Sequence, residues 1–303
     1  MPTPQAGIFA LGTRTHHHLE FDVNGSVRPA LIGAAVAALN EQIVGSGGSN
    51  VVVGFGPDLW RGLSDSVPAD LGSFAEITGC DGHIAPSTQH DLWIWIHGTG
   101  VDDVLDLATA ATSILEGVAT LAAESRCFVY HDSRDLTGFI DGTENPPPTA
   151  AVSVACIADG APGAGGSHVI AQRWVHDLAA FDELNVADQE LVIGRRKVDS
   201  AALPKEILPT DAHVSRAELL DEDGHERPIY RRSLPFGDVT ERGLFFVGFS
   251  AERDRFNGML AQMYGTASDG LRDRLLDFST PVTGSYYFAP CVEDLLDAAA
   301  DQR

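Results

Sequence analysis

The chain has 303 residues, of which 44% are hydrophobic and 21% are charged, the composition of an ordinary folded protein long enough for two domains. Its 43 acidic residues outnumber the 20 basic ones, and the formal net charge of −23 would repel a polyphosphate backbone, which argues against nucleic acid as a partner. No apolar run approaches the roughly 20 residues of a membrane-spanning helix, so no membrane partner is expected either.

Hydrophobic spacing predicts both helices and strands in the first half of the chain. Apolar residues recur at helical spacing over residues 24–43, and the β-branched run 51–53 follows as a strand. Residues 90–97 alternate as a strand does, because every second side chain would face the same side. Residues 102–123 have the period of a long helix, and residues 127–131 are predicted to form a further short strand.

The second half repeats these kinds of element after the proline-rich stretch 146–148. We predict a helix over 252–264, helices and loops inserted between strands over 185–220, and strands over 168–175, 228–232, 243–250 and 284–289. Strands often follow strands without an intervening helix, so we expect an α+β fold with antiparallel sheets and not a doubly wound parallel sheet. The boundary is expected near residues 132–150, giving domains 1–135 and 136–303.

The segment GFIDGTENP, residues 138–146, is the most informative stretch of the sequence. Its glycines, Gly138 and Gly142, lie on either side of Asp141. Glycine tolerates positive φ and close backbone approach, so the acid between them could be presented into a cavity. From the residues alone, Asp-Gly-Thr is equally the sequence of an ordinary surface turn, and that interpretation stays open.

The same segment resembles the GxxDG signature of the dye-decolourising, or DyP-type, haem peroxidases. Other segments resemble this family in order along the chain: QRWVHDL, AFDEL, LVIGR, DAHVSRA around His213, YRRSLPFG around Arg231, GLFFVGF and TPVTGSYYFAP, with weaker matches at LEF and WIWIHG in the first half. The spacings also fit the family, since 72 residues separate Asp141 from His213 and 18 separate His213 from Arg231. YRRSLPFG points to the bacterial branch called B-type.

The resemblance implies a fold and a cofactor. It implies two ferredoxin-like α+β domains with antiparallel sheets, of the dimeric α+β barrel type, and a non-covalent haem b (iron protoporphyrin IX) in the second. His213 would be the ligand of the iron, and a carboxylate that accepts from its other nitrogen would fix the tautomer and make the ligand more electron-donating. Asp273 is the first choice for that carboxylate and Asp277 the second. From spacing alone, alternative ligands would be His168, His176 and His225.

The resemblance also implies how peroxide is handled. Asp141 would move a proton between the two oxygens of H₂O₂, and burial would have to raise its pKa above the usual value near 3.9 for it to store that proton. Arg231 stays cationic and would stabilise the developing anion. On a strand only one of Arg231 and Arg232 can face the pocket, and both could instead be exposed. The implied enzyme is a peroxidase that reduces hydrogen peroxide and oxidises small-molecule electron donors (dyes, phenols, Mn²⁺) through a ferryl intermediate.

Several neighbouring residues, Arg231 among them, are expected to contribute to the cofactor site. Asn145 would help to hold the loop around the haem, and Ser233 stands where some relatives carry Asn. Phe246 or Phe245 would form part of the wall, although one of the two should point away from the haem. Residues 195–197 form a small basic cluster, and with the glycine before them they read Gly-Arg-Arg-Lys, where relatives often have Gly-Arg-Thr-Lys. Because of this departure, it stays open whether the cluster contacts a haem propionate or an interface, or lies in solvent.

Other features leave alternatives open. The run His16–His18 is more typical of the start of a strand than of a metal site. Four aromatic residues could relay an oxidising equivalent but are more often core packing: Trp174, Tyr264, Tyr286 and Tyr287. Two rival functions for a haem protein of this type are a haem carrier and a protein that releases iron from haem, as a deferrochelatase would.

Compartment and assembly are predicted from less specific signals. Residues 1–21 contain neither a basic segment followed by an apolar stretch nor a twin-arginine pair, which favours a cytoplasmic location. The four cysteines form no CxxC or CxxCH motif and are expected to be reduced. The sequence VEDLLDAAADQR, at 292–303, lacks the Gly-Ser-Leu type motif that directs some family members into encapsulin shells. A homo-oligomer is expected, because sheets of this type leave surfaces to cover.

Overall fold

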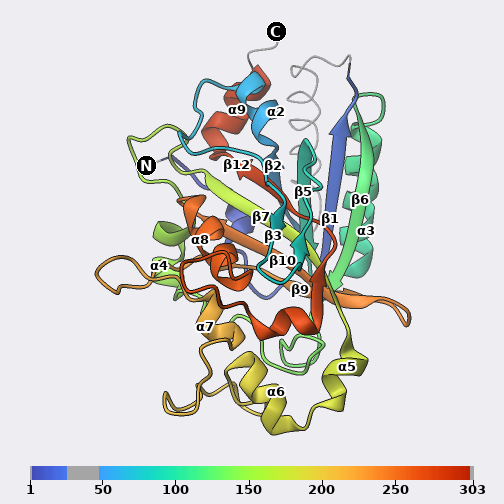
Figure 1. The fold of residues 1–303 in the computed structure, drawn as a ribbon. Coiled ribbons are helices and arrows are strands. Elements are labelled where there is room, and N and C mark those ends of the chain that lie inside the picture. Colours follow the sequence, from blue (N-terminus) through green and yellow to red (C-terminus); the bar gives the residue numbers. More distant parts are fainter. Residues whose placement is uncertain (1, 26–47, 301–303) are drawn as a thin grey trace.

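The computed structural model describes residues 2–25 and 48–300, so the helix predicted over residues 24–43 lies almost entirely outside the described residues. Its main feature is one antiparallel sheet with the strand order β11-β7-β12-β2-β5-β1-β6-β9-β10-β8. Because β7 also pairs with β10, this sheet closes on itself as a barrel (Figure 1). Its strands are β1 (Thr15–Val23), β2 (Asn50–Phe55), β5 (Leu92–Gly98), β6 (Ala119–Phe128), β7 (Ser167–His176), β8 (Tyr230–Arg231), β9 (Leu234–Gly237), β10 (Arg242–Ser250), β11 (Ser279–Pro281) and β12 (Ser285–Ala289).

The two halves of the chain contribute equivalent sets of strands to this barrel. Across the sheet, the strands of the first half lie in the order β6-β1-β5-β2, and those of the second half lie in the order β12-β7-β10-β9. In each set, the strand that comes first in the chain lies between the strand that comes last and the strand before it. The seams between the two sets are narrow: β2 meets β12 through Phe55 and Phe288, and β6 meets β9 through Cys127 and Phe236. A small separate hairpin is formed by β3 (Ile77–Thr78) and β4 (Ile84–Ala85).

Strand alternation decides which side chains face the barrel interior. On β5, Leu92, Ile94 and Ile96 pack in the core outside the barrel, whereas Trp93 and Trp95 pack inside it. The outer core is covered by α3 (Val101–Ile114), which contacts β1 and β5 and lies along the barrel wall (Figure 1). Both faces of these strands are therefore buried, which is why β5 has no exposed residue.

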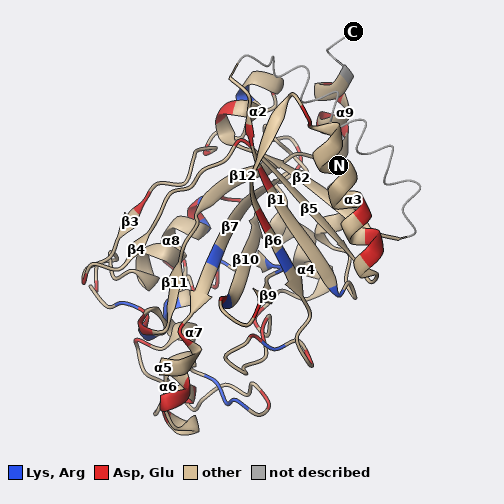
Figure 2. Cartoon of the chain, turned by 90° about the vertical axis from the view of Figure 1, so that its right-hand side faces the viewer, with Lys and Arg blue, Asp and Glu red and all other residues tan. Residues whose placement is uncertain are grey.

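The remaining helices lie around the barrel and at one end of it. A lobe at that end, in yellow to orange in Figure 1, contains α5 (Leu178–Glu183), α6 (Val186–Ile193) and α7 (His213–Ala217). It has a small core of its own around Phe139, Phe181 and Val192. The other helical segments are η1 (Ala6–Ile8), α2 (Pro57–Leu63), α4 (Pro148–Ala155), α8 (Asp254–Met263), η2 (Arg274–Asp277) and α9 (Val292–Ala300). Acidic side chains recur on the outer helices, including α2, α3 and α6 (Figure 2).

The predicted fold class is confirmed, since helices surround an antiparallel sheet that forms a barrel. The predicted strands over 51–53, 90–97, 168–175, 243–250 and 284–289 are present, as are the helix over 252–264 and the helices and loops over 185–220. Within residues 2–25 and 48–300, no helix is both long and apolar enough to cross a bilayer.

Three predicted boundaries were wrong. The helix predicted over 102–123 ends at Ile114, because the chain turns at Gly117, where φ is +84°, and continues as β6 from Ala119. The strand predicted over 127–131 is the end of β6, which stops at Phe128. The strand predicted over 228–232 is reduced to Tyr230–Arg231, which pairs with only two residues of β10.

Candidate active site

A cavity of about 280 Å³ opens between the barrel and the lobe of α5, α6 and α7, and three of the predicted site residues line it, Asp141, His213 and Arg231. A smaller cavity of about 90 Å³ continues from it beside β10, and a third of about 380 Å³ shares Asp141, Gly142 and Arg231 with the first. Asp141 and Arg231 line all three cavities, and His213 lines the first two. The three residues therefore meet at one place although they lie far apart in the sequence.

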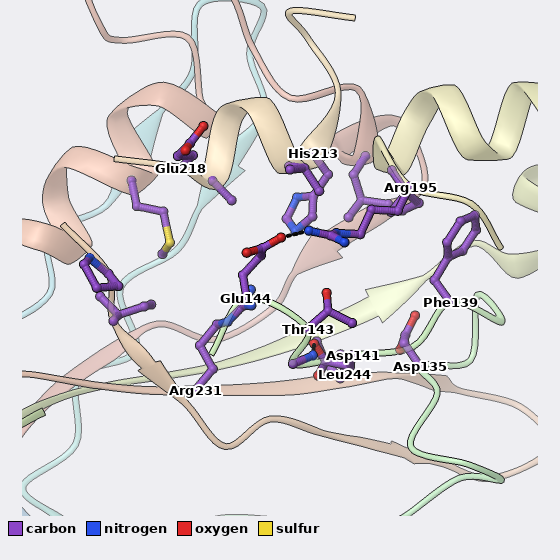
Figure 3. Close-up of a pocket in the computed structure, with 18 of the residues that line it drawn as sticks. Asp135, Phe139, Asp141, Thr143, Glu144, Arg195, His213, Glu218, Arg231 and Leu244 are labelled. Atoms are coloured by element: carbon purple, nitrogen blue, oxygen red, sulfur yellow. Dashed lines mark hydrogen bonds and ion pairs between the residues drawn. The ribbon is translucent and has the colours of Figure 1, made fainter. Parts of the chain in front are cut away.

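His213 is the first residue of α7 and points into the cavity (Figure 3). Its Nδ1 lies 2.7 Å from Oδ2 of Asp273, a carboxylate with no exposed surface. The other oxygen of Asp273 accepts a hydrogen bond from the backbone N–H of Leu275, which holds the carboxylate in place at the start of η2. Since Nδ1 is bonded to Asp273, Nε2 is the nitrogen left for a ligand in the cavity.

The electrostatics of His213 follow from this pair. Burial alone disfavours the charged imidazolium, but the charge of Asp273 and its hydrogen bond outweigh burial, and the pKa of His213 is raised above its usual value. The second candidate carboxylate, Asp277, is instead bonded to Arg272 and faces solvent. Of the two, only Asp273 contacts His213.

Asp141 lies across the cavity from His213, in the loop between Gly138 and Gly142 (Figure 3). Both glycines have positive φ, +89° and +76°, so the turn requires residues without a Cβ. The carboxylate of Asp141 accepts a hydrogen bond of 2.7 Å from the N–H of Gly142. Burial raises the pKa of Asp141, the charge of Arg231 opposes this rise in part, and the net shift is upward.

Arg231 and Arg232 point in different directions, as expected for neighbours on a strand. Arg231 lines the cavities, and its backbone is held on both sides by Asn145, whose amide donates to the carbonyl of Arg231 and accepts from its N–H, both at 2.8 Å. Arg232 lines the third cavity but neither of the two that contain His213, and its guanidinium donates to the carbonyls of Ile8 and Ala10. Asn145 itself lines the third cavity.

Two further candidates lie at the edges of the site. Phe246 lines the smaller cavity beside β10, whereas Phe245 faces the barrel interior. Ser233 lines the third cavity and not the one that contains His213, and its hydroxyl accepts a hydrogen bond from the N–H of Val247.

The three alternative histidines are placed differently from His213. His168 is buried and lies 2.9 Å from Asp70, and His225 is exposed near Asp221. His176 does line the cavity, but both its ring nitrogens have partners, Ser279 at 2.8 Å and Asp135 at 3.2 Å. Among these four histidines, His213 alone combines a place in the cavity with a ring nitrogen left for a ligand.

Sequence reasoning missed two interactions in this site. The hydrogen-bonded series Ser279–His176–Asp135 joins residues so far apart in the sequence that no spacing could have indicated it. Burial disfavours the Asp135 carboxylate, but His176 and Thr137 outweigh burial and lower its pKa to about 2. At the mouth of the cavity, Arg195 forms an ion pair with Glu144 (Figure 3). Only the departure from the family pattern near Arg195 had drawn attention to that segment.

Comparison with protein families identifies two matches that together cover most of the chain. The model described as "Dyp-type peroxidase, N-terminal" matches residues 5–128, and "Dyp-type peroxidase, C-terminal" matches residues 132–294. Among curated proteins, the dye-decolorizing peroxidase of Rhodococcus erythropolis is 37% identical over 99% of this chain and 87% of its own length. That of Mycobacterium tuberculosis is 39% identical over 82% of this chain and 75% of its own length.

Solved structures give the same result. A DypB variant of Rhodococcus jostii, solved in complex with heme, has a TM-score of 0.92 and 34% identity, covering 96% of this chain and 97% of that one. The encapsulated DyP-type peroxidase of Mycobacterium smegmatis has a TM-score of 0.92 and 34% identity, covering 97% and 98%. A DypB variant in complex with manganese has a TM-score of 0.86 and 34% identity, covering 93% and 94%.

The family resemblance seen in the sequence is therefore confirmed over both halves of the chain. Relatives more than 30% identical match it over nearly its full length, and their structures superpose on its barrel. The protein belongs to the Dyp-type peroxidase family.

Proposed function

We propose that this protein is a haem peroxidase that reduces H₂O₂ and oxidises organic donors such as dyes and phenols. In this proposal His213 holds the iron of a non-covalent haem b, Asp273 orients His213, and Asp141 and Arg231 act on peroxide. The observation that carries the proposal is the His213–Asp273 pair facing Asp141 and Arg231 across one cavity. A neighbour of 34% identity, the DypB variant, was solved with heme.

The residues of the cavity fit such a cofactor. Within residues 2–25 and 48–300, no group of three or more His, Cys, Asp or Glu side chains could hold a metal ion alone, so an ion on His213 would have to bring further ligands with it, as the iron of a porphyrin does. Leu244, Phe246 and Met259 provide apolar walls. Both amide atoms of Gln172, which lines the smaller cavity, have no partner among the described residues, as expected where a bound group or water completes a site.

When bound, haem would supply the iron that binds peroxide and takes up its oxidising equivalents. Asp273 accepts from Nδ1 of His213 and so keeps Nε2 unprotonated and electron-rich for the metal. Arg195 lies on the cavity wall, where its guanidinium forms an ion pair with Glu144. With haem bound, Arg195 could pair with a carboxylate of the cofactor instead of with Glu144.

Asp141 and Arg231 would then have different roles in the reaction with peroxide: Asp141 would transfer a proton, and Arg231 would stabilise a negative charge. Asp141 takes the proton from one peroxide oxygen and delivers it to the other, which leaves as water. Its raised pKa suits this task, because a carboxyl group that holds its proton more firmly can store it between the two transfers. Arg231 stabilises the negative charge that develops as the proton moves, and its planar guanidinium orients the oxygens.

The experiment that tests this function is rapid mixing of the haem-reconstituted protein with H₂O₂, followed by absorbance. The wild-type protein should convert to an oxidised form that a phenolic donor returns to rest, whereas Arg231→Ala should react far more slowly. A haem carrier would not respond to peroxide and would tolerate loss of both Asp141 and Arg231. A protein that releases iron would yield free protoporphyrin, which product analysis would detect.

Mn²⁺ is a second candidate donor. Glu144, Glu218 and Glu226 line the first cavity, although no three such groups among the described residues lie close enough to hold an ion by themselves, and a DypB variant was solved in complex with manganese. Carboxylate oxygens suit this ion. Measuring oxidation of Mn²⁺ in the wild-type protein and in Glu226→Gln tests this possibility.

We also propose domains at 1–135 and 136–303, a cytoplasmic location and a homo-oligomer. The narrow seams between the two strand sets support the division into domains. The four free thiols suit a reducing compartment. Light scattering of the purified protein would test the oligomer, and separate expression of each half would test the boundary.

A further inference from the structure

The barrel interior contains polar and aromatic side chains that the proposed reaction does not use. On the inward faces of β1 and β5, residues stand opposite one another in register as three pairs: His16 with His97, His18 with Trp95, and Glu20 with Trp93. All six are buried. An apolar filling would stabilise such a core more simply, because buried polar groups must be hydrogen-bonded to avoid a desolvation penalty.

Glu20 has one specific partner in this interior. The hydroxyl of Tyr287, on β12, donates to Oε1 of Glu20 at 2.6 Å, and only 1% of Tyr287 and 3% of Glu20 are exposed. A phenol hydrogen-bonded to a carboxylate is easier to oxidise than an isolated phenol, because its proton moves to the carboxylate as the electron leaves. The high-energy cationic form of the phenol is then avoided.

A continuous series of ring contacts leads from Tyr287 toward the active-site cavity. Tyr287 stacks on Trp93 with centroids 6.0 Å apart and an interplanar angle of 15°, and Trp93 lies 6.1 Å from Trp95. His18 stacks on Trp95 at 5.8 Å and on Phe245 at 4.0 Å. These separations are those of direct aromatic contact.

The last ring of this series lies on the wall between the two compartments. Phe245 belongs to β10 and faces the barrel interior, while its neighbours Leu244 and Phe246 line the cavity on the other face of the strand. One strand therefore separates the ring series from the place where the cofactor would bind.

We propose that Tyr287 and Glu20 form a buried one-electron redox site that supplies an electron to the active-site cavity through Trp93 and Trp95. This inference rests on the proposed haem peroxidase function, which supplies the oxidant, a cofactor oxidised by H₂O₂. Tyr287 loses one electron to the cofactor, its O–H bond breaks, the proton passes to Glu20, and a neutral tyrosyl radical remains. A later electron from a donor and the return of the proton from Glu20 restore the pair.

The consequence is protection of the cavity when no donor is present. Met259 and Met263 line the smaller cavity and are oxidisable thioethers. An oxidising equivalent that moves to Tyr287 lies inside the barrel, away from these side chains and from His213.

The three other buried tyrosines lack the feature that makes Tyr287 suitable, and Tyr230 lies beside the Arg232 guanidinium, which cannot take up a proton. Tyr286 points to the opposite face of β12 and donates to the amide oxygen of Asn257 at 2.9 Å, which cannot take up a proton. The hydroxyl of Tyr264 has no partner among the described residues. Tyr286 thus provides a matched control next to Tyr287 in the chain.

The test is electron paramagnetic resonance of the haem-reconstituted protein, frozen rapidly after mixing with H₂O₂ without donor. The wild-type protein should give a tyrosyl signal that ring-deuterated tyrosine narrows. Tyr287→Phe should lose this signal and Tyr286→Phe should keep it. Glu20→Gln, which keeps an acceptor atom but cannot take the proton, should also lose it. A signal that persists in Tyr287→Phe, or that disappears equally in Tyr286→Phe, would overturn the proposal.

Two further measurements keep the result decisive. High-field electron paramagnetic resonance of the wild-type protein needs no variant. It should show the lowered g₁ value of a tyrosyl radical whose oxygen accepts a hydrogen bond, here from protonated Glu20. A g₁ value typical of a tyrosyl radical without a hydrogen bond would refute the pair. Haem absorbance is recorded on the same samples. A spectral change with peroxide but no tyrosyl signal refutes the inference alone, whereas no spectral change refutes the peroxidase function and the inference with it.

Discussion

The fully buried carboxylate of Asp273 lies 2.7 Å from Nδ1 of His213, across the cavity from Asp141 and Arg231. A carboxylate without exposed surface is costly unless its charge is compensated. Here the compensation comes from His213 and from the backbone N–H of Leu275. The pair is thus built to hold one imidazole tautomer in a fixed orientation.

Replacing Asp273 should weaken the cofactor site without removing its ligand. In Asp273→Asn we expect haem affinity to fall about 10- to 100-fold, the usual effect of losing such a supporting carboxylate, and the reduction potential of the iron to become more positive because the imidazole donates less. Haem titration and potentiometry measure both effects. Asp277→Asn is the control, since Asp277 is bonded to Arg272, and an equal effect in the two variants would contradict the assignment.

Arg231 should matter more for the reaction with peroxide than for cofactor binding. We expect Arg231→Leu to lower the second-order rate constant with H₂O₂ by about 10²- to 10³-fold, as is typical when one preorganised electrostatic group is lost. Arg231→Lys should restore only part of it, because an ammonium lacks the planar fork of donors.

The neighbouring arginine offers a control for this measurement. Arg232 bonds the carbonyls of Ile8 and Ala10, so Arg232→Lys should lower the thermal midpoint and leave the rate constant with peroxide close to that of the wild type. The assignment of Arg231 would be wrong if the two variants lost peroxide reactivity to the same extent.

Local periodicity explains which parts of the fold could be predicted. Residues 90–97 and 243–250 alternate clearly, and both are strands. The end of α3 could not be predicted, because Ala119–Ala123 fits a helical period as well as a strand, and in the short connection over residues 115–118 only Gly117 signals a break. Closure of the barrel depends on contacts such as Phe55 with Phe288, which no local pattern encodes.

In the site too, residues with a local sequence signal could be predicted, whereas contacts between distant segments could not. Asp141 was indicated by its flanking glycines, and both adopt positive φ. His213 stood out only through the family resemblance, since nothing in its spacing separated it from His176. His176 and its two partners, Asp135 and Ser279, lie in three distant segments of the chain, so this series could be found only in the folded chain.

The reaction with peroxide should depend on pH through Asp141. Because Asp141 must first accept a proton, its ionised form is the reactive one, and the rate should fall as pH drops through its pKa. Burial raises that pKa, so the fall should occur above the usual carboxyl range. Arg231 lowers the pKa, so Arg231→Leu should shift the fall to still higher pH. Asp141→Asn should abolish it, and an unchanged pH profile in that variant would exclude Asp141 as the base.

The glycines around Asp141 allow stability and function to be separated. Gly142 has φ of +76° and Gly160, in an exposed loop, has φ of +85°. Alanine at either position should destabilise the protein by about 1 kcal/mol, the cost of a left-handed conformation for a residue with a Cβ. Only Gly142→Ala should also slow the reaction with peroxide, because the N–H of Gly142 bonds the carboxylate of Asp141. Thermal unfolding and stopped-flow absorbance measure the two effects.

Net charge should influence which donors the enzyme accepts. The formal charge of −23 attracts cationic dyes and repels sulfonated ones, although Arg195, Arg227 and Arg255 line the cavity and oppose that field locally. Because salt screens such interactions, kcat/KM for a cationic dye should fall as ionic strength rises, and kcat/KM for an anionic dye should increase. The reverse response, with kcat/KM falling for the anionic dye and rising for the cationic dye, would mean that the cavity arginines, and not the overall charge, govern donor approach. Arg227→Gln, which removes one of these cations, should then reduce turnover of the anionic dye alone.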